Sequence, residues 1–241
     1  MIKSLLPALA FSIAAAPAVA FDINAMTDAE RQTFQSEIRS YLLNNPHVLV
    51  EALTIYQEQN SDASLINANY AELVGDDHSW VGGNPDGDVT IIEFLDYRCG
   101  FCRRAFPAVE ELVSTDGNIR IIVKELPVLG PQSELAARFA IATLQTEGPE
   151  AYKTVHDTLM TFRGQISERA LARVANDNGF DVDTIIAAMG TPAVEEVINE
   201  NRSLAQTLRV SGTPTFVIGG QMVRGFLPLE GMSAIVAEER G

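Results

Sequence analysis

Two cysteines, Cys99 and Cys102, lie three residues apart in the middle of the chain, and the sequence contains no others. They follow the apolar run 89–95, which predicts a strand that leads into a helix. Cysteines at this spacing share one helix face and can close a disulfide. Cys99 would lie at the helix N-terminus, where the helix dipole and free N–H groups favour the thiolate. The pattern therefore predicts a redox pair, in which Cys99 attacks and Cys102 resolves the mixed disulfide.

Metal binding is the competing use of such a pair. A tetrahedral zinc site needs more ligands, and none of the three histidines, at 47, 78 and 156, has ligand spacing to the cysteines. We therefore predict no resident metal and no cofactor beyond the redox pair. The reduced pair could still serve as a soft dithiolate ligand for Cu(I). A copper-binding protein that confers copper tolerance is thus an alternative to the enzyme.

The N-terminus predicts export. A short basic start, Met1-Ile2-Lys3, precedes the apolar stretch 5–16 and the tripeptide Ala18-Val19-Ala20. This order is typical of a signal peptide over residues 1–20. An uncleaved membrane anchor is the alternative, but the apolar stretch is shorter than the roughly 20 residues that cross a bilayer. We expect a periplasmic protein, in a compartment where disulfides persist.

The composition excludes some partners. The chain of 241 residues has 32 acidic and 17 basic residues, a formal charge of −15. Nucleic acids and anionic membranes attract basic surfaces, so neither is an expected partner. Hydrophobic residues make up 46% of the chain, which is enough for a sizeable core.

A helical arm is predicted over residues 21–74. Thr27 and Glu30 form a capping box, and Pro46 stands at the first position of a second helix. The arm is amphipathic and too short to fold alone, so its apolar stripe must pack on the main domain or on another subunit. Both alternatives are open, and the second would make the protein a homo-oligomer.

Residues 75–241 predict an α/β domain with a mixed sheet. The expected elements are a strand at 89–96, a helix at 99–114, a strand at 119–124, four or five helices over 133–209, a hairpin of strands 215–218 and 222–224, and a last helix at 229–239.

Two motifs resemble the DsbA family of thioredoxin-fold proteins. They are Glu-Phe-Leu-Asp-Tyr-Arg-Cys-Gly-Phe-Cys at 93–102 and Gly-Thr-Pro-Thr-Phe at 212–216. The resemblance implies a thioredoxin fold with a helical insertion at about 131–209 and an N-terminal helical extension. Residues 42–53 are similar to the N-terminal segment of ScsC-like and Com1-like members, in some of which that segment drives oligomerisation.

The resemblance also implies roles for three more residues. Glu93 matches a buried acid beneath the active site, which could exchange protons with Cys102. A carboxylate that faces water at a sheet edge is the alternative for Glu93. Pro214 matches the family's cis-proline, and the backbone of Thr213 would pair with a client strand. The implied partners are exported client proteins with cysteines and a membrane redox protein that recycles the pair.

The dipeptide between the cysteines leaves the direction of electron flow open. Strong oxidants of the family carry Pro-His there, and the histidine helps to hold the thiolate, whereas this chain has Gly100-Phe101. Gly-aromatic, together with Thr213 before the proline, is more similar to the isomerases DsbC and DsbG. Oxidase, isomerase and reductase activities all remain alternatives.

Three arginines, Arg98, Arg103 and Arg104, surround the cysteines. They could favour the thiolate or steer acidic clients, or they could form an ordinary solvated helix face.

Overall fold

The computed structural model describes residues 25–241, so the predicted signal peptide at 1–20 lies outside the described residues. The chain divides into two compact units between Thr54 and Ile55. None of the helices in residues 25–241 is long and apolar enough to cross a membrane.

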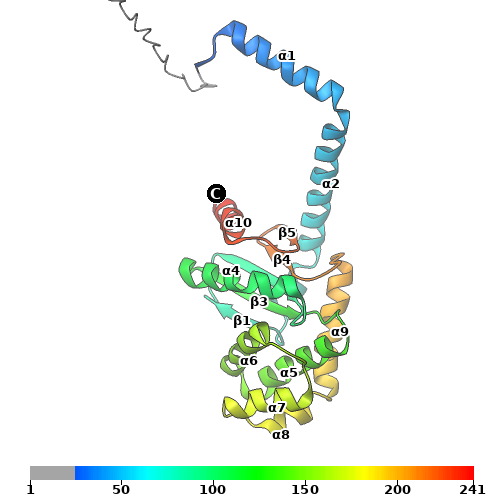
Figure 1. The fold of residues 1–241 in the computed structure, drawn as a ribbon, viewed down its shortest axis with the longest axis vertical. Helices are drawn as coiled ribbons and strands as arrows, with labels where there is room; N and C mark the ends of the chain where they lie inside the picture. Colours follow the sequence, from blue (N-terminus) through cyan, green and yellow to red (C-terminus); the bar gives the residue numbers. More distant parts are fainter. Residues whose placement is uncertain (1–24) are drawn as a thin grey trace, which may run out of the picture. The chain divides into compact units, whose positions relative to one another are not determined.

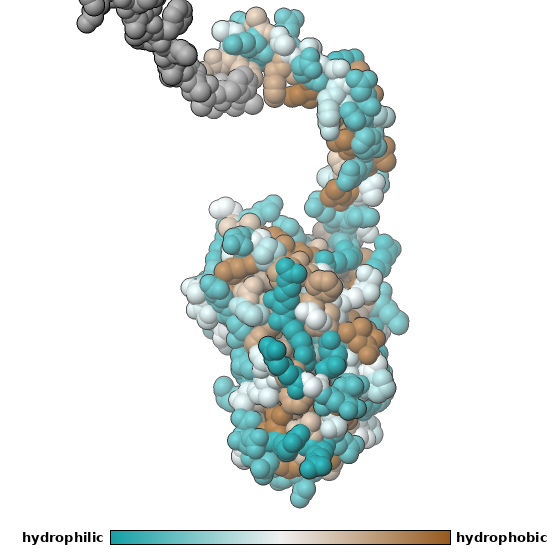
Figure 2. Space-filling view, in the orientation of Figure 1, coloured by the Kyte–Doolittle hydropathy of each residue, from teal (hydrophilic) through white to brown (hydrophobic). Residues whose placement is uncertain are grey.

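The first unit consists of α1 (Asp28–Asn44) and the beginning of α2 (Pro46–Ala68). The predicted capping box is present, because the Thr27 N–H donates to the Glu30 carboxylate at 2.9 Å and the Glu30 N–H donates to the Thr27 hydroxyl at 3.3 Å. No residue of α1 is buried. Apolar patches alternate with polar ones along these helices (Figure 2), and the exposed apolar residues are Phe34, Ile38, Tyr41, Leu43, Leu49, Val50 and Leu53.

The second unit is built on a five-stranded mixed sheet in the order β1-β3-β2-β4-β5 (Figure 1). The strands are β1 (Trp80–Gly83), β2 (Val89–Leu95), β3 (Ile119–Glu125), β4 (Thr215–Ile218) and β5 (Gln221–Arg224). β2 runs parallel to β3, and the other neighbouring pairs are antiparallel. The sequence did not predict β1, because two of its four residues are glycines and glycine is rare in strands.

Helices cover both faces of the sheet. On one face, α4 (Gly100–Asp116) packs beside α10 (Leu229–Arg240), and the odd-numbered residues of β2 point into this core. On the other face lie the end of α2, α3 (Tyr70–Val74) and α9 (Pro192–Thr207). Since Ile66 and Leu73 are fully buried there, the unit that holds the sheet begins before the predicted boundary at residue 75.

A helical block separates β3 from β4 in the chain. It consists of α5 (Pro131–Glu147), α6 (Pro149–Thr161), α7 (Glu168–Asp177), α8 (Val182–Ala188) and α9. Three of the five helices begin with proline, a residue that suits the first helical position because it lacks an N–H. The block extends beyond the sheet (Figure 1), which agrees with the expected helical insertion into a thioredoxin fold.

Candidate active site

The two cysteines lie where β2 gives way to α4. Cys99 is the N-cap residue of α4, and its carbonyl accepts the Arg103 N–H at 3.1 Å. Cys102 lies one turn further on, and both thiols are free. Cys99 is 7% exposed and Cys102 is 0% exposed. Cys99 is thus the less buried of the two thiols, in agreement with its expected greater exposure.

The Thr213–Pro214 loop faces Cys99. The Cys99 thiol donates to the Thr213 carbonyl at 3.1 Å, although 114 residues separate the two in the sequence. The Thr213–Pro214 peptide bond is cis, as the family resemblance implies. The Pro214 carbonyl accepts the Gly225 N–H at 2.8 Å, so the hairpin of β4 and β5 holds the loop. The fold therefore brings both predicted loop residues to the redox pair.

Cys102 is held in the neutral thiol form. Burial raises the pKa of its thiol far above the usual range, and the charges of Glu93 and Cys99 raise it further. Hydrogen bonds to the main chain of Asp96 and the side chain of Thr213 offset part of this shift in pKa. Because the thiolate is the nucleophile, Cys102 would need a nearby base in its predicted role of resolving a mixed disulfide.

Glu93 is a buried acid on the central strand β2, where it is 3% exposed. This excludes the alternative of a carboxylate that faces water. Glu93 lies between Ile91 and Leu95 on the face that packs against Cys102, and its Oε1 atom has no hydrogen-bond partner among residues 25–241. Burial, with a smaller contribution from Glu110, raises the pKa of Glu93 to about 8. A carboxyl with such a pKa can gain or lose a proton near neutral pH.

A second buried acid, Glu125, was not predicted from the sequence. It ends β3 opposite Leu95 of β2, on the same face as Glu93. Its carboxylate accepts hydrogen bonds from the hydroxyls of Tyr152 and, at 3.5 Å, Tyr97. Burial raises the pKa of Glu125 to about 7. The sequence does contain a signal for Glu125, because an acidic residue at the end of an apolar strand is as unusual as Glu93 in the middle of one.

Aromatic residues enclose this second acid. The Tyr97 hydroxyl lies 3.2 Å from Nδ1 of His156, whose pKa burial lowers to about 3. The rings of Trp80 and Tyr152 stack at 5.4 Å between their centroids. Since Tyr97 precedes Cys99 by two residues, this cluster connects the redox pair to the helical insertion.

Two of the three arginines near the cysteines also reach the insertion. Arg98 donates to the Gly164 carbonyl at 3.0 Å, and Arg103 donates to the Leu159 carbonyl at 3.4 Å. Arg104 lies 4.3 Å from the centroid of the Phe226 ring. Arg98 and Arg103 thus join the active-site turn to the insertion, which a merely solvated helix face would not do.

A mixed sheet between helices, a CxxC pair at a helix N-terminus and a cis-proline facing it define a thioredoxin-fold thiol–disulfide oxidoreductase. Residues 90–237 match the family model of the DSBA-like thioredoxin domain, and the chain belongs to that family. Residues 30–63 match the model of the copper resistance protein ScsC N-terminal domain, which identifies the chain as an ScsC-like member.

Solved structures agree with this assignment. A thioredoxin-like oxidoreductase from Silicibacter pomeroyi DSS-3 is 38% identical, with a TM-score of 0.66 over 70% of this chain and 96% of that chain. The thiol-disulfide exchange protein alpha-DsbA2 from Wolbachia pipientis is 28% identical, with a TM-score of 0.70 over 76% of this chain and 97% of that chain.

A longer relative matches over part of its length. The Na(+)/H(+) antiporter NhaA 1 of Salinispora arenicola is 32% identical over 165 residues, which are 68% of this chain. The chain spans only 25% of the length of that antiporter, so its transport activity is not carried over.

Proposed function

We propose that this protein is an exported thiol–disulfide oxidoreductase that exchanges disulfides with the cysteines of other periplasmic proteins. The asymmetry of the redox pair carries the proposal: Cys99 is 7% exposed at a helix N-terminus, and Cys102 is fully buried beside Glu93. Localisation rests on the signal peptide predicted at residues 1–20. A membrane redox protein would return the pair to its starting state after each cycle.

In the oxidising direction, a client thiolate attacks Sγ of Cys99 in the Cys99–Cys102 disulfide. The S–S bond breaks, Cys102 leaves as a thiolate, and Glu93 in its protonated form supplies the proton that Cys102 takes up. A second client thiolate then attacks the client sulfur of the mixed disulfide and releases Cys99. The client loses two electrons, and the pair gains them.

In the reducing direction, the same groups act in reverse. The Cys99 thiolate attacks a client disulfide, whose S–S bond breaks and releases one client thiolate. The Glu93 carboxylate then accepts the Cys102 proton, and the Cys102 thiolate attacks Sγ of Cys99 and releases the second client thiolate. An isomerase uses only the first attack and regains free Cys99 when another client thiolate resolves the complex. The Phe101 side chain offers no hydrogen-bond donor to hold the Cys99 thiolate, which favours isomerisation or reduction over strong oxidation.

The client is proposed to bind along the Thr213–Pro214 loop. An extended client segment would pair with the Thr213 backbone, as strands add to exposed edges in other complexes. The contact between Cys99 and the Thr213 carbonyl supports this proposal, because a segment paired with Thr213 would lie beside the reactive sulfur.

Paired redox assays test the proposal. The oxidised protein should restore activity to reduced, unfolded ribonuclease, or the reduced protein should precipitate insulin by cleaving its disulfides. The double variant Cys99→Ser/Cys102→Ser should do neither, because serine cannot form a disulfide. Equilibration with glutathione gives the direction: a strongly oxidising potential indicates a disulfide donor, and one near thioredoxin's indicates reduction or isomerisation. Tight Cu(I) binding without thiol exchange would contradict the proposal and support the copper-binding alternative.

Self-association through the N-terminal helices is a further part of the proposal. The helices expose large apolar side chains in water, and such surfaces mark protein interfaces. We expect the chain from residue 21 to be an oligomer in multi-angle light scattering and a chain that starts at Ile55 to be a monomer. A start at Ile55 retains Ile66 and Leu73, which the core of the second unit requires. The replacement of Leu49 and Leu53 by serine in the longer chain should also yield monomers, and equal masses for all three proteins would contradict the role of the arm.

A further inference from the structure

Asp96 is a buried carboxylate for which the proposed exchange reaction has no chemical use. It is 2% exposed and lies three residues before Cys99, directly after β2. A carboxylate that leaves water is costly unless hydrogen bonds replace its hydration. In the part of the chain that the structure describes, the donors to the Asp96 side chain are three main-chain N–H groups, those of Arg98, Val128 and Leu129.

The two oxygens of Asp96 hold different segments. Oδ1 accepts the Arg98 N–H at 2.7 Å, within the turn that ends at Cys99. Oδ2 accepts the N–H groups of Val128 at 2.9 Å and Leu129 at 3.1 Å, in the loop between β3 and α5. One side chain therefore connects the turn that carries the nucleophile to a loop 32 residues further along the chain.

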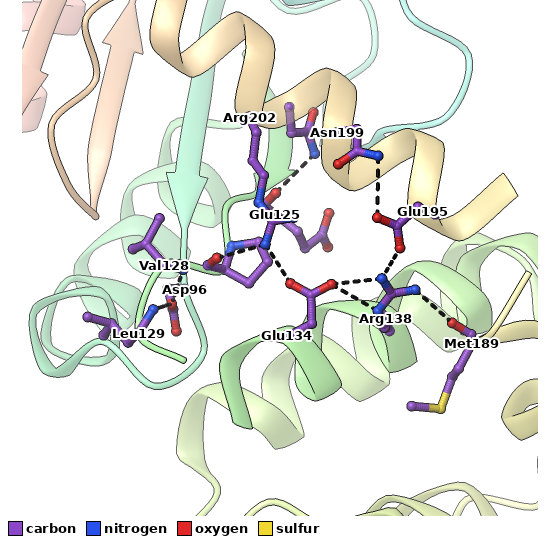
Figure 3. A network of polar contacts seen from close by, with 12 residues as sticks. Asp96, Glu125, Val128, Leu129, Glu134, Arg138, Met189, Glu195, Asn199 and Arg202 are labelled. Atoms are coloured by element: carbon purple, nitrogen blue, oxygen red, sulfur yellow. Dashed lines mark hydrogen bonds and ion pairs between the residues drawn. The ribbon is translucent and has the colours of Figure 1, made fainter. Parts of the chain in front are cut away.

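Figure 3 shows Asp96 next to Val128 and Leu129, and Arg202 of α9 near Glu125. From α9, Asn201 donates to the Glu125 carbonyl at 3.2 Å and Arg202 donates to the Pro127 carbonyl at 3.3 Å. Hydrogen bonds thus connect the beginning of the loop, at Glu125 and Pro127, to α9, and Asp96 connects Val128 and Leu129 to the active-site turn.

This loop presents apolar side chains near the turn that carries the redox pair. Val128 is 51% exposed and Leu129 is 56% exposed, and Phe101, between the cysteines, is 58% exposed. We call Val128 and Leu129 the apolar ledge. The Asp96 carboxylate is hydrogen-bonded both to the main chain of the ledge and to the turn that carries Cys99.

We propose that Asp96 is a positioning residue that fixes the apolar ledge beside Cys99, so that clients with apolar residues next to the reacting cysteine bind preferentially. The inference rests on the proposed thiol exchange and names its preferred substrate. Asp96 touches no reacting atom through its carboxylate. Its effect is on the binding of the client and not on the chemistry of the thiols.

Asp96→Asn tests the inference. Asparagine keeps the size of the side chain but replaces one acceptor oxygen by an NH₂ donor, which cannot bond to an N–H. We expect the KM for a peptide disulfide flanked by leucines to rise about tenfold, the effect of losing one or two hydrogen bonds to a charged group. The KM for a glycine-flanked peptide, kcat for both peptides and the equilibrium constant with glutathione should change less than about twofold.

The double variant Val128→Ser/Leu129→Ser tests the ledge without touching Asp96. It should raise the KM for the leucine peptide similarly, and Asp96→Asn in that background should add little, because the two changes act on the same contact. Amide exchange should become faster at residues 128 and 129 in Asp96→Asn and stay unchanged at Ile122 in the middle of β3. If Asp96→Asn does not fold, the double variant alone decides whether the ledge selects clients.

Three results would overturn the inference. The first is an unchanged KM for the leucine peptide in the double variant. The second is an equal loss of kcat for both peptides in Asp96→Asn, which would assign Asp96 to the Cys99 turn alone. The third is additive effects of the two changes. A wild-type protein that exchanges thiols with neither peptide nor glutathione would instead overturn the proposed function, and the inference with it.

Discussion

Replacement of Cys99 by serine is expected to reduce disulfide exchange at least about a thousandfold, because the barrier rises by about 4 kcal/mol or more when the attacking thiolate is lost. Serine is close in size to cysteine and leaves the fold intact. Cys102 cannot take over the attack, because it is fully buried and its pKa is raised far above the usual range. Initial rates of insulin reduction at pH 7.5 measure the loss.

Cys102→Ser is the matched variant with a different expected outcome. Cys99 can still attack a client disulfide, but no second thiol is present to resolve the product. Mixed disulfides with clients should therefore accumulate and appear on non-reducing gels. Equal residual rates for the two variants, or mixed disulfides with Cys99→Ser, would contradict the assignment of Cys99 as the nucleophile.

Glu93→Gln is expected to change the dependence of stability on pH. The pKa of Glu93 is raised to about 8 in the folded protein from an ordinary value of 4.5, so the folded state keeps its proton longer than the unfolded state. The contribution of Glu93 to the free energy of unfolding is fully present below pH 4.5 and is lost as the pH rises to 8. At 1.36 kcal/mol per pKa unit, the loss is on the order of 4 kcal/mol at pH 8.

Urea unfolding from pH 5 to pH 9 measures this effect, in the Cys99→Ser/Cys102→Ser background so that no thiol titrates. Glutamine does not ionise, so the variant should gain stability relative to its parent as the pH rises to 8. Parallel curves for parent and variant would contradict the buried, protonated state of Glu93.

Glu125→Gln serves as the control for this experiment. The pKa of Glu125 is raised to about 7, so its contribution is lost over the window from pH 4.5 to pH 7 and not beyond. His156 acts with the opposite sign, because its lowered pKa removes stability as the pH falls from 6.5 to 3. Of Glu93, Glu125 and His156, only Glu93 should therefore contribute to the fall in stability above pH 7.

The sequence predicted most elements of the fold because their signals are local. The capping box of Thr27 and Glu30 and the proline at position 46 mark helix starts through neighbouring residues. The apolar run before Cys99 reads as a strand buried on both faces, and β2 lies at the centre of the sheet. The strand β1 was missed because its pairing with β3 comes from tertiary contacts and not from side-chain pattern.

By itself, the sequence predicted a redox pair, and it determined the position of that pair at a helix N-terminus and the family that its motifs resemble. Only the tertiary structure decided which polar groups share the site, because burial and hydrogen bonding depend on segments far apart in the chain. Sheet register places Glu125 on the same face as Glu93, and loop packing gives the Asp96 carboxylate its donors at Val128 and Leu129. Chain folding also brings the Thr213 carbonyl to the Cys99 thiol across 114 residues, a contact that no local pattern encodes.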